Sequence, residues 1–247
     1  MKILLIVIVC FTSFSDLFAA ARVASVTGNW NDTNTWGGLS VPTLSDAVTI
    51  NDGITVTVDL ALAECASLNT LNTGGITISG SNSLSVAGLL SMARPSANNT
   101  NFTIAIGAGS LTVGSLTMSA TTTTRNNIIT ISTGTFTILG TATTGTTGCQ
   151  LTLTGAGTID FRGIFASTPT ITTFAGSTVK YSYAGVQTVR GATYSNLEIS
   201  GNGIKTLGAA ATVTGSLTVR AGSTLALAAF ALASPSSIVL ECGAPTG

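Results

Sequence analysis

The chain has 247 residues, of which 45% are hydrophobic and only 7% are charged, with nine basic and nine acidic residues. An ordinary globular domain carries about 25% charged residues, and a net charge of zero provides no field that would attract nucleic acid or an anionic membrane surface. The sequence has no histidine, which excludes His-based catalytic triads and histidine metal ligands.

The amino-terminal residues 1–21 have the three-part pattern of a secretory signal peptide. Met1-Lys2 is a short positive start, residues 3–11 are an unbroken apolar run, and Ala19-Ala20-Ala21 offers small residues for cleavage before Arg22. Nine apolar residues are too few to cross a hydrocarbon core that needs about 20. We therefore expect a protein that is secreted or displayed at the cell surface, without a membrane span.

The segment that follows the leader, residues 22–59, differs in composition from the rest of the chain. Its frame is Gly28-Asn29-Trp30, Thr35-Trp36-Gly37-Gly38, Pro42, Asp46-Ala47-Val48-Thr49-Ile50, Gly53 and Val56-Thr57-Val58-Asp59. This order resembles the start of G8-type domains and the amino-terminal cap of secreted β-helix proteins common in Bacteroidetes. The resemblance implies an amino-terminal cap and first coil.

A physical interpretation of the same segment leaves two roles open. The first coil of a solenoid has one face without a neighbour, and Trp30 and Trp36 are large enough to cover it. Asp46, Asp52 and Asp59 flank expected strands, where aspartate suits turns. Alternatively the tryptophans bind sugar rings and the three carboxylates bind calcium, although their spacing matches no known loop motif. No other cofactor is expected.

A five-residue unit recurs through the rest of the chain, residues 60–247. Glycine begins it, a hydroxyl residue follows, and apolar residues alternate with threonine, as in Gly215-Ser216-Leu217-Thr218-Val219. Units that start at 114, 134, 157 and 176 predict coils of 19 to 23 residues. The fold expected is a right-handed parallel β-solenoid, with a β-sandwich as the alternative. The expected inward residues include Leu111, Val113, Phe136, Ile138, Leu217 and Val219.

The stretch from Gly176 onward carries a second resemblance. It contains Gly176-Ser177-Thr178-Val179-Lys180-Tyr181, Gln187-Thr188-Val189, Tyr194-Ser195-Asn196-Leu197, residues 200–207 and residues 213–219. Over about 44 residues this order is similar to a repeat of large exported Bacteroidetes surface proteins. The resemblance implies an adhesin-like protein and names no ligand.

Few residues offer catalytic chemistry. Asp160 and Glu198 stand alone in the body, whereas Lys180, Tyr181, Tyr183 and Arg190 form a cluster of the types that polysaccharide lyases use. In a strand Lys180 points away from Tyr181, so at most part of the cluster converges. We expect a non-catalytic protein of adhesion or of polysaccharide or matrix contact, with Trp30, Trp36, Lys180, Tyr181 and Arg190 as candidate carbohydrate-binding residues. A lyase-like β-helix enzyme is the alternative.

Three further expectations concern cysteines, threonines and the carboxyl end. Cys65, Cys149 and Cys242 match no metal motif and are expected as small buried apolar side chains, with one disulfide open as an alternative. Paired threonines such as Thr55 and Thr57 suggest ice binding as a remote alternative, which their irregular spacing disfavours. The carboxyl end has no aromatic lid or charged terminal helix, so we expect a truncated solenoid that self-associates through an open strand edge.

Overall fold

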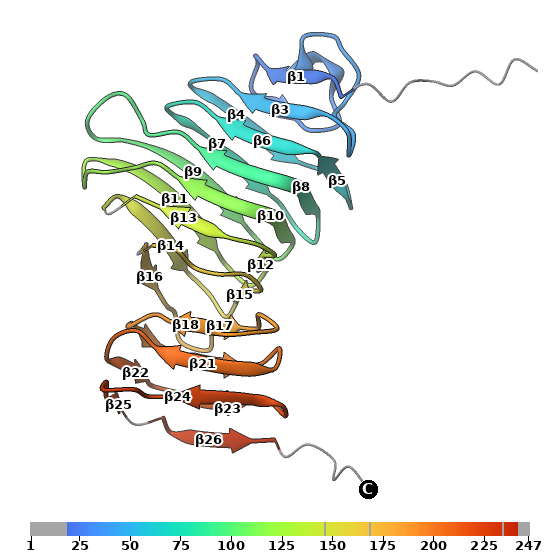
Figure 1. The fold of residues 1–247 in the computed structure, drawn as a ribbon. Helices are drawn as coiled ribbons and strands as arrows, with labels where there is room; N and C mark the ends of the chain where they lie inside the picture. Colours follow the sequence, from blue (N-terminus) through green and yellow to red (C-terminus); the bar gives the residue numbers. More distant parts are fainter. Residues whose placement is uncertain (1–18, 146, 168, 234, 242–247) are drawn as a thin grey trace, which may run out of the picture.

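The computed structural model describes residues 19–145, 147–167, 169–233 and 235–241. The chain winds into a stack of coils, and the short strands of successive coils build one sheet that runs the length of the stack and others that cover part of it (Figure 1). Eleven strands follow one another along the main sheet, so ten turns separate the first from the last. All pairings between named strands are parallel, which confirms the β-solenoid and overturns the β-sandwich alternative.

Four sheets make up the walls of the solenoid. The main sheet holds thirteen strands: β1 (Ala21–Ala24), β3 (Ala47–Ile50), β5 (Ala63–Cys65), β6 (Ser67–Thr70), β8 (Ser83–Met92), β10 (Ser110–Met118), β12 (Thr135–Ile138), β13 (Ala142–Thr144), β15 (Thr158–Phe161), β17 (Thr178–Tyr181), β20 (Asn196–Ile199), β23 (Ser216–Val219) and β26 (Ser237–Leu240). The second holds seven: β2 (Gly28–Asn29), β4 (Ile54–Val58), β7 (Gly74–Ile78), β9 (Thr100–Ile106), β11 (Arg125–Ile131), β14 (Cys149–Leu153) and β16 (Thr170–Thr172).

Two three-stranded sheets replace the seven-stranded sheet in the carboxyl-terminal coils. They consist of β18 (Gln187–Val189), β21 (Gly203–Leu207) and β24 (Ser223–Ala226), and of β19 (Thr193–Tyr194), β22 (Ala211–Val213) and β25 (Leu232–Ala233). Among the described residues the sole helix is the short 3₁₀ helix η1 (Thr33–Trp36).

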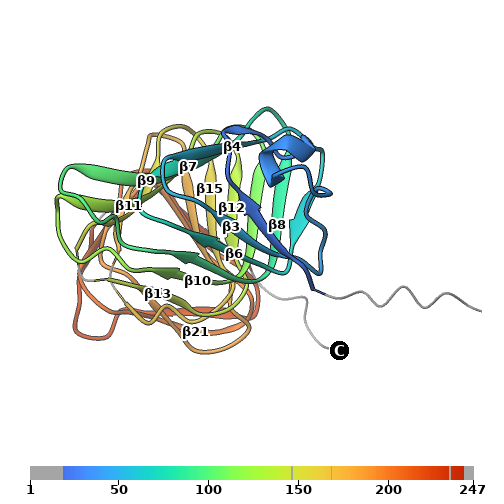
Figure 2. The same ribbon diagram turned by 90° about the horizontal axis from the view of Figure 1, so that it is seen from above.

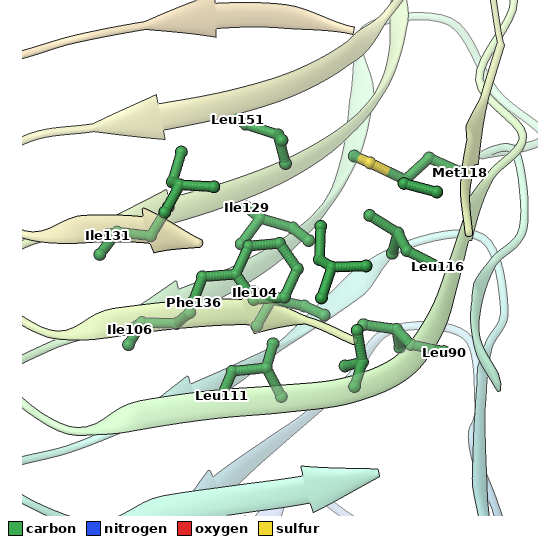
Figure 3. Packing of buried hydrophobic residues seen from close by; sticks show 14 of the residues in the cluster. Leu90, Ile104, Ile106, Leu111, Leu116, Met118, Ile129, Ile131, Phe136 and Leu151 are labelled. Atoms are coloured by element: carbon green, nitrogen blue, oxygen red, sulfur yellow. The ribbon is translucent and has the colours of Figure 1, made fainter. Parts of the chain in front are cut away.

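Alternation of apolar and hydroxyl residues explains these strands, because successive side chains of a strand point to opposite faces. The expected inward residues Leu111, Val113, Phe136, Ile138 and Leu217 are all buried. The side chains of Leu111 and Phe136 point toward those of the opposite wall, where Ile104, Ile129 and Leu151 lie (Figure 3). Val219 is only half-buried, since β26 alone follows its strand in the main sheet.

The coil length expected from glycine spacing is wrong at one step by five residues and at another by one, since Thr158 pairs with Thr178 and that coil advances by 20 residues rather than 19. Ser110 pairs with Thr135, so this coil advances by 25 residues rather than by the 20 expected between Gly114 and Gly134. Another copy of the unit, Gly109-Ser110-Leu111-Thr112-Val113, directly precedes the one at Gly114. The apolar and hydroxyl residues of both copies lie in one long strand, β10, and therefore in a single coil. Because the two units have nearly the same sequence, the sequence alone could not show which of them begins the coil.

The amino-terminal tryptophans lie in the interior. Trp30 and Trp36 are 0% and 1% exposed, and their rings meet edge to face with centroids 5.1 Å apart. The indole nitrogen of Trp36 donates to the Trp30 carbonyl oxygen at 2.8 Å. Positive φ angles at Gly37 and Gly38 let the chain turn directly after η1. This segment lies at the amino-terminal end of the stack (Figure 1), and the view from above shows it over the coils (Figure 2).

The cysteine expectation is confirmed for two of the three residues. Cys65 and Cys149 are free and buried, and burial, with a smaller contribution from the charge of Asp46, raises the pKa of the Cys65 thiol to about 12. A neutral thiol is a poor nucleophile, so both side chains act as small apolar residues. Cys242 lies outside the described residues, as do residues 1–18 of the expected leader.

Candidate functional site

Two adjoining hollows lie where the seven-stranded sheet gives way to the smaller sheets. The first, of about 350 Å³, is lined by Pro169, Ile171, Thr188, Arg190, Gly191, Ala192, Gly208 and Ala209. The second, of about 340 Å³, is lined by Gly191, Ala192, Thr193, Ala210, Ala211, Thr212, Ala231 and Ala233. They share Gly191 and Ala192, so we describe them together as the corner groove.

The corner groove exists because small residues occupy the turns between the two three-stranded sheets. A Cβ atom on Gly191 would lie 2.6 Å from the Cβ of Ala209 and 2.7 Å from the Ala210 carbonyl oxygen. Real Cβ atoms do not approach so closely, which means that the coils stack here only with glycine at this position. At the amino-terminal side, β16 is the last strand of its sheet, and Ile171 of β16 lines the groove.

Among the described residues, Arg190 is the only charged one that lines the corner groove. Its guanidinium carbon lies 5.6 Å from the centre of the Phe165 ring, a geometry typical of a cation–π contact. The ion pairs within the described part of the chain involve Arg22, Arg162, Lys180 and Arg220, so Arg190 has no carboxylate partner there.

Two buried tyrosines hold the backbone of Arg190. The amide of Arg190 donates to Tyr181 Oη at 3.1 Å, and Tyr194 Oη donates to the Arg190 carbonyl oxygen. The two phenol oxygens lie 3.0 Å apart. Desolvation raises the pKa of Tyr181 to about 12, against the smaller opposing effect of its hydrogen bonds, and raises the pKa of Tyr194 well above its usual value. Both phenols are therefore neutral and position Arg190.

Lys180 lies away from this cluster, as the alternation in β17 predicts. Its side chain points outward and its ammonium lies 3.5 Å from Glu198 Oε1. Arg220 pairs with the same carboxylate at 3.2 Å. Burial alone would raise the pKa of Glu198, but the hydrogen bond from Arg220 and the charges of Lys180 and Arg220 lower it. Of the expected cluster, only Arg190 and the backbone-holding Tyr181 come together.

The structure does not support the remaining expected site residues. Trp30 and Trp36 are buried, so neither indole face is open to a sugar ring. Asp46, Asp52 and Asp59 do not converge: Asp46 accepts from Ala20 and Thr43, Asp52 from Thr73, and Asp59 from Asn31. Among the described residues, no group of three His, Cys, Asp or Glu side chains could hold a metal ion. The carboxylates instead satisfy turn amides, as their positions beside strands suggested.

The paired threonines are distributed over several sheets, yet one aligned column is present. On the outward side of the seven-stranded sheet, successive strands place in register Thr57, Thr77, Ala105, Thr130, Thr152 and Thr172. The column is regular in space although the residues are unevenly spaced in sequence, because coil lengths differ. The irregular spacing is therefore no argument against a threonine array.

Lys205 is a buried charged residue that sequence reasoning missed. Its side chain is 0% exposed and its ammonium donates to the carbonyl oxygens of Tyr183, Gly185 and Asn202. No carboxylate among the described residues forms an ion pair with Lys205. Desolvation lowers the pKa of its ammonium group. The inward position of Lys205 in β21 was readable from alternation, but the carbonyl cage depends on the turns of the neighbouring coil.

Replacing Lys205 by methionine is expected to lower the free energy of unfolding by about 2 kcal/mol at neutral pH, because three carbonyl groups lose their donor. A lowered pKa in the folded state means that the unfolded state binds more protons just below the usual lysine pKa. Stability of the parent protein relative to Lys205→Met should therefore rise with pH in that window. Urea unfolding at pH 7 to 10 measures both effects, and a pH-independent difference would contradict the second.

Comparisons with models of known protein families, with curated proteins and with solved structures found no match to this chain. The class that the structure defines is therefore a parallel β-solenoid, without a further family. The resemblances to G8-type domains and to exported surface repeats stay predictions. No helix among the described residues is long and apolar enough to cross a membrane.

Proposed function

We propose that this chain is an exported, non-catalytic β-solenoid that contacts an acidic extracellular polysaccharide or matrix through the corner groove. The observation that carries the proposal is Arg190, which lines a groove whose other described lining residues are neutral and which has no carboxylate partner among the described residues. The leader-like amino terminus and the low charge of the chain support export. The adhesin-like interpretation fits the same features.

The dimensions and chemistry of the groove suit a polysaccharide chain. Ligand sites commonly measure about 300 to 1,000 Å³, and each hollow falls at the lower end of this range. Hydroxyls of Thr188, Thr193 and Thr212 can exchange hydrogen bonds with sugar hydroxyls. A guanidinium binds a carboxylate or sulfate in bidentate fashion, so uronic acids and sulfated sugars are the expected class.

The lyase alternative has less support because its candidate base and its arginine are not arranged to act together. Lys180 is paired with Glu198, and Tyr181 is buried and neutral. A base must reach the proton it removes, and neither side chain lines the corner groove. Turnover of an acidic polysaccharide that Lys180→Ala abolishes would favour the enzyme.

Arg190→Ala is expected to weaken binding to polygalacturonate by about tenfold, which corresponds to roughly 1.4 kcal/mol for a charge-assisted contact. Affinity electrophoresis of the purified protein in gels that contain polygalacturonate or a neutral glucan measures the effect. Arg94→Ala removes an arginine outside the groove and should bind like the parent protein. Equal weakening by both substitutions would reduce the effect to net charge and overturn the proposed site.

Ice binding is a second candidate because of the threonine column described above. Neighbouring strands of a sheet lie about 4.8 Å apart, so in-register threonines present a regular array of hydroxyl and methyl groups. An ice-recrystallisation assay of the purified protein separates this candidate from polysaccharide contact. Ice binding would be favoured if the parent protein inhibits ice recrystallisation and the Thr130→Lys variant does not.

Two finer features of the fold belong to the same proposal. The crossover connections that join parallel strands of one sheet are right-handed in about 98% of cases. This frequency supports a right-handed coil. Burial of Trp30 and Trp36 at the first coil supports a cap over residues 22–59.

A further inference from the structure

Asp46 is a buried carboxylate that binds the backbone of Ala20, near the end of the expected leader. It is 3% exposed, and its Oδ1 accepts a hydrogen bond from the Ala20 amide at 3.0 Å. Its Oδ2 accepts from the amide and the hydroxyl of Thr43, both at 2.9 Å, and lies 3.5 Å from Arg22 Nε. Burial would raise the pKa of Asp46, but these hydrogen bonds and the charge of Arg22 lower it, so the group is ionised.

Residues 20 and 21 are integrated into the fold. The Ala47 amide donates to the Ala20 carbonyl oxygen at 2.9 Å, and Ala21 forms the first register pair of β1 with Ala47 of β3. Cleavage before Arg22, the position that the small residues suggested, would delete these contacts. It would also leave Asp46 Oδ1 without the Ala20 donor in a nearly solvent-free position, which is unfavourable for a carboxylate.

We propose that leader removal occurs between Ala19 and Ala20, and that Asp46 binds the new amino terminus of the mature chain. The inference rests on the export part of the proposed function. Hydrolysis breaks the Ala19–Ala20 peptide bond: the oxygen of water joins the Ala19 carbonyl carbon to form a carboxylate, and both protons of the water pass to the nitrogen of Ala20, which becomes an ammonium group. A neutral amide donor to Asp46 is thereby replaced by a cation at the same nitrogen. Ala19 is a small residue directly before this cut, while the position three before it is Leu17, so the contacts of Ala20 rather than an Ala-x-Ala pattern select the site.

The position of the cut is tested by expressing the full chain in an exporting bacterial host and measuring the intact mass and amino-terminal sequence of the product. A mature chain that begins at Ala20 supports the proposal. A product that begins at Ala21 or Arg22 overturns it while leaving export intact. A cell-retained chain that keeps its leader overturns it together with the export proposal, so the two failures are distinguishable.

The role of Asp46 is tested by the reactivity of the Ala20 amine. A buried carboxylate partner raises the pKa of an amine by one unit or more, so acetylation of the Ala20 amine at pH 7 should be at least about tenfold slower in the processed protein than in its Asp46→Asn variant. Asp52→Asn removes a carboxylate that instead binds Thr73 and Asn72, and should react like the parent protein. Equal rates in the parent protein and Asp46→Asn would overturn the assignment.

Discussion

Replacing Leu217 by aspartate is expected to lower the free energy of unfolding by about 3 to 5 kcal/mol, because an unpaired carboxylate would lie in the apolar interior. Leu217 is 5% exposed and its backbone pairs with Leu197 on one side and Ile238 on the other. The substitution therefore places the charge in the middle one of three consecutive coils, where it affects the packing of both neighbours. We expect the carboxyl-terminal coils to open first, since nearest-neighbour contacts carry stability in a solenoid.

Urea unfolding followed by circular dichroism measures this loss, and limited proteolysis locates it. Thr218→Lys is the matched control, because Thr218 is the next residue of β23, points outward and lies in register with Glu198. It should leave stability within about 0.5 kcal/mol of the parent protein. Equal destabilisation by both substitutions would mean that β23 has no buried face.

The fold was predictable because strand alternation is a local property. Residues such as Leu111 and Val113 are separated by Thr112, and a sheet with one buried face must place the two aliphatic side chains inward. The coil register was less predictable, as the Gly109 and Gly114 units show. Which glycine begins a coil depends on the partner strand, and Ser110 finds both Ser83 and Thr135 at the same level.

The candidate site was predictable only in part. Alternation placed Lys180 and Tyr181 on opposite faces, as observed, but it could not show that Tyr181 would hold the Arg190 backbone. That contact joins β17 to the turn after β18 across the interior. Trp30 and Trp36 are of the residue type that binds sugars, but they are buried like core residues. The sequence alone could not distinguish the two roles, because burial depends on packing. The corner groove depends on where the seven-stranded sheet ends and the two three-stranded sheets begin. The alternation of apolar and polar residues within a strand does not predict that position.

The outer edge of β26 is expected to join two copies of this chain. In the main sheet β26 pairs with β23 only, so its other edge has no partner among the described residues. Ile238 and Leu240 occupy the inward register positions opposite Leu217 and Val219, yet they are 60% and 69% exposed. An apolar inward row and a strand edge that no described residue pairs with together form a surface that another strand can cover.

Two copies can cover this surface by placing their β26 strands side by side in antiparallel orientation about a two-fold axis. Such an isologous contact uses the same surface of both chains, so association stops at the dimer. Light scattering at rising protein concentration should show the mass shift from monomer to dimer. The double substitution Ile238→Lys with Leu240→Lys should keep the protein monomeric, because lysines facing each other across the edge repel.

Val186→Lys is the matched control for this double substitution. Val186 is 70% exposed and lies outside β26, so the variant adds a lysine at an exposed valine without touching the edge. It should dimerise like the parent protein. A parent protein that stays monomeric at high concentration would show that the β26 edge is protected in solution. Dimers that persist after the double substitution would assign the contact to another surface.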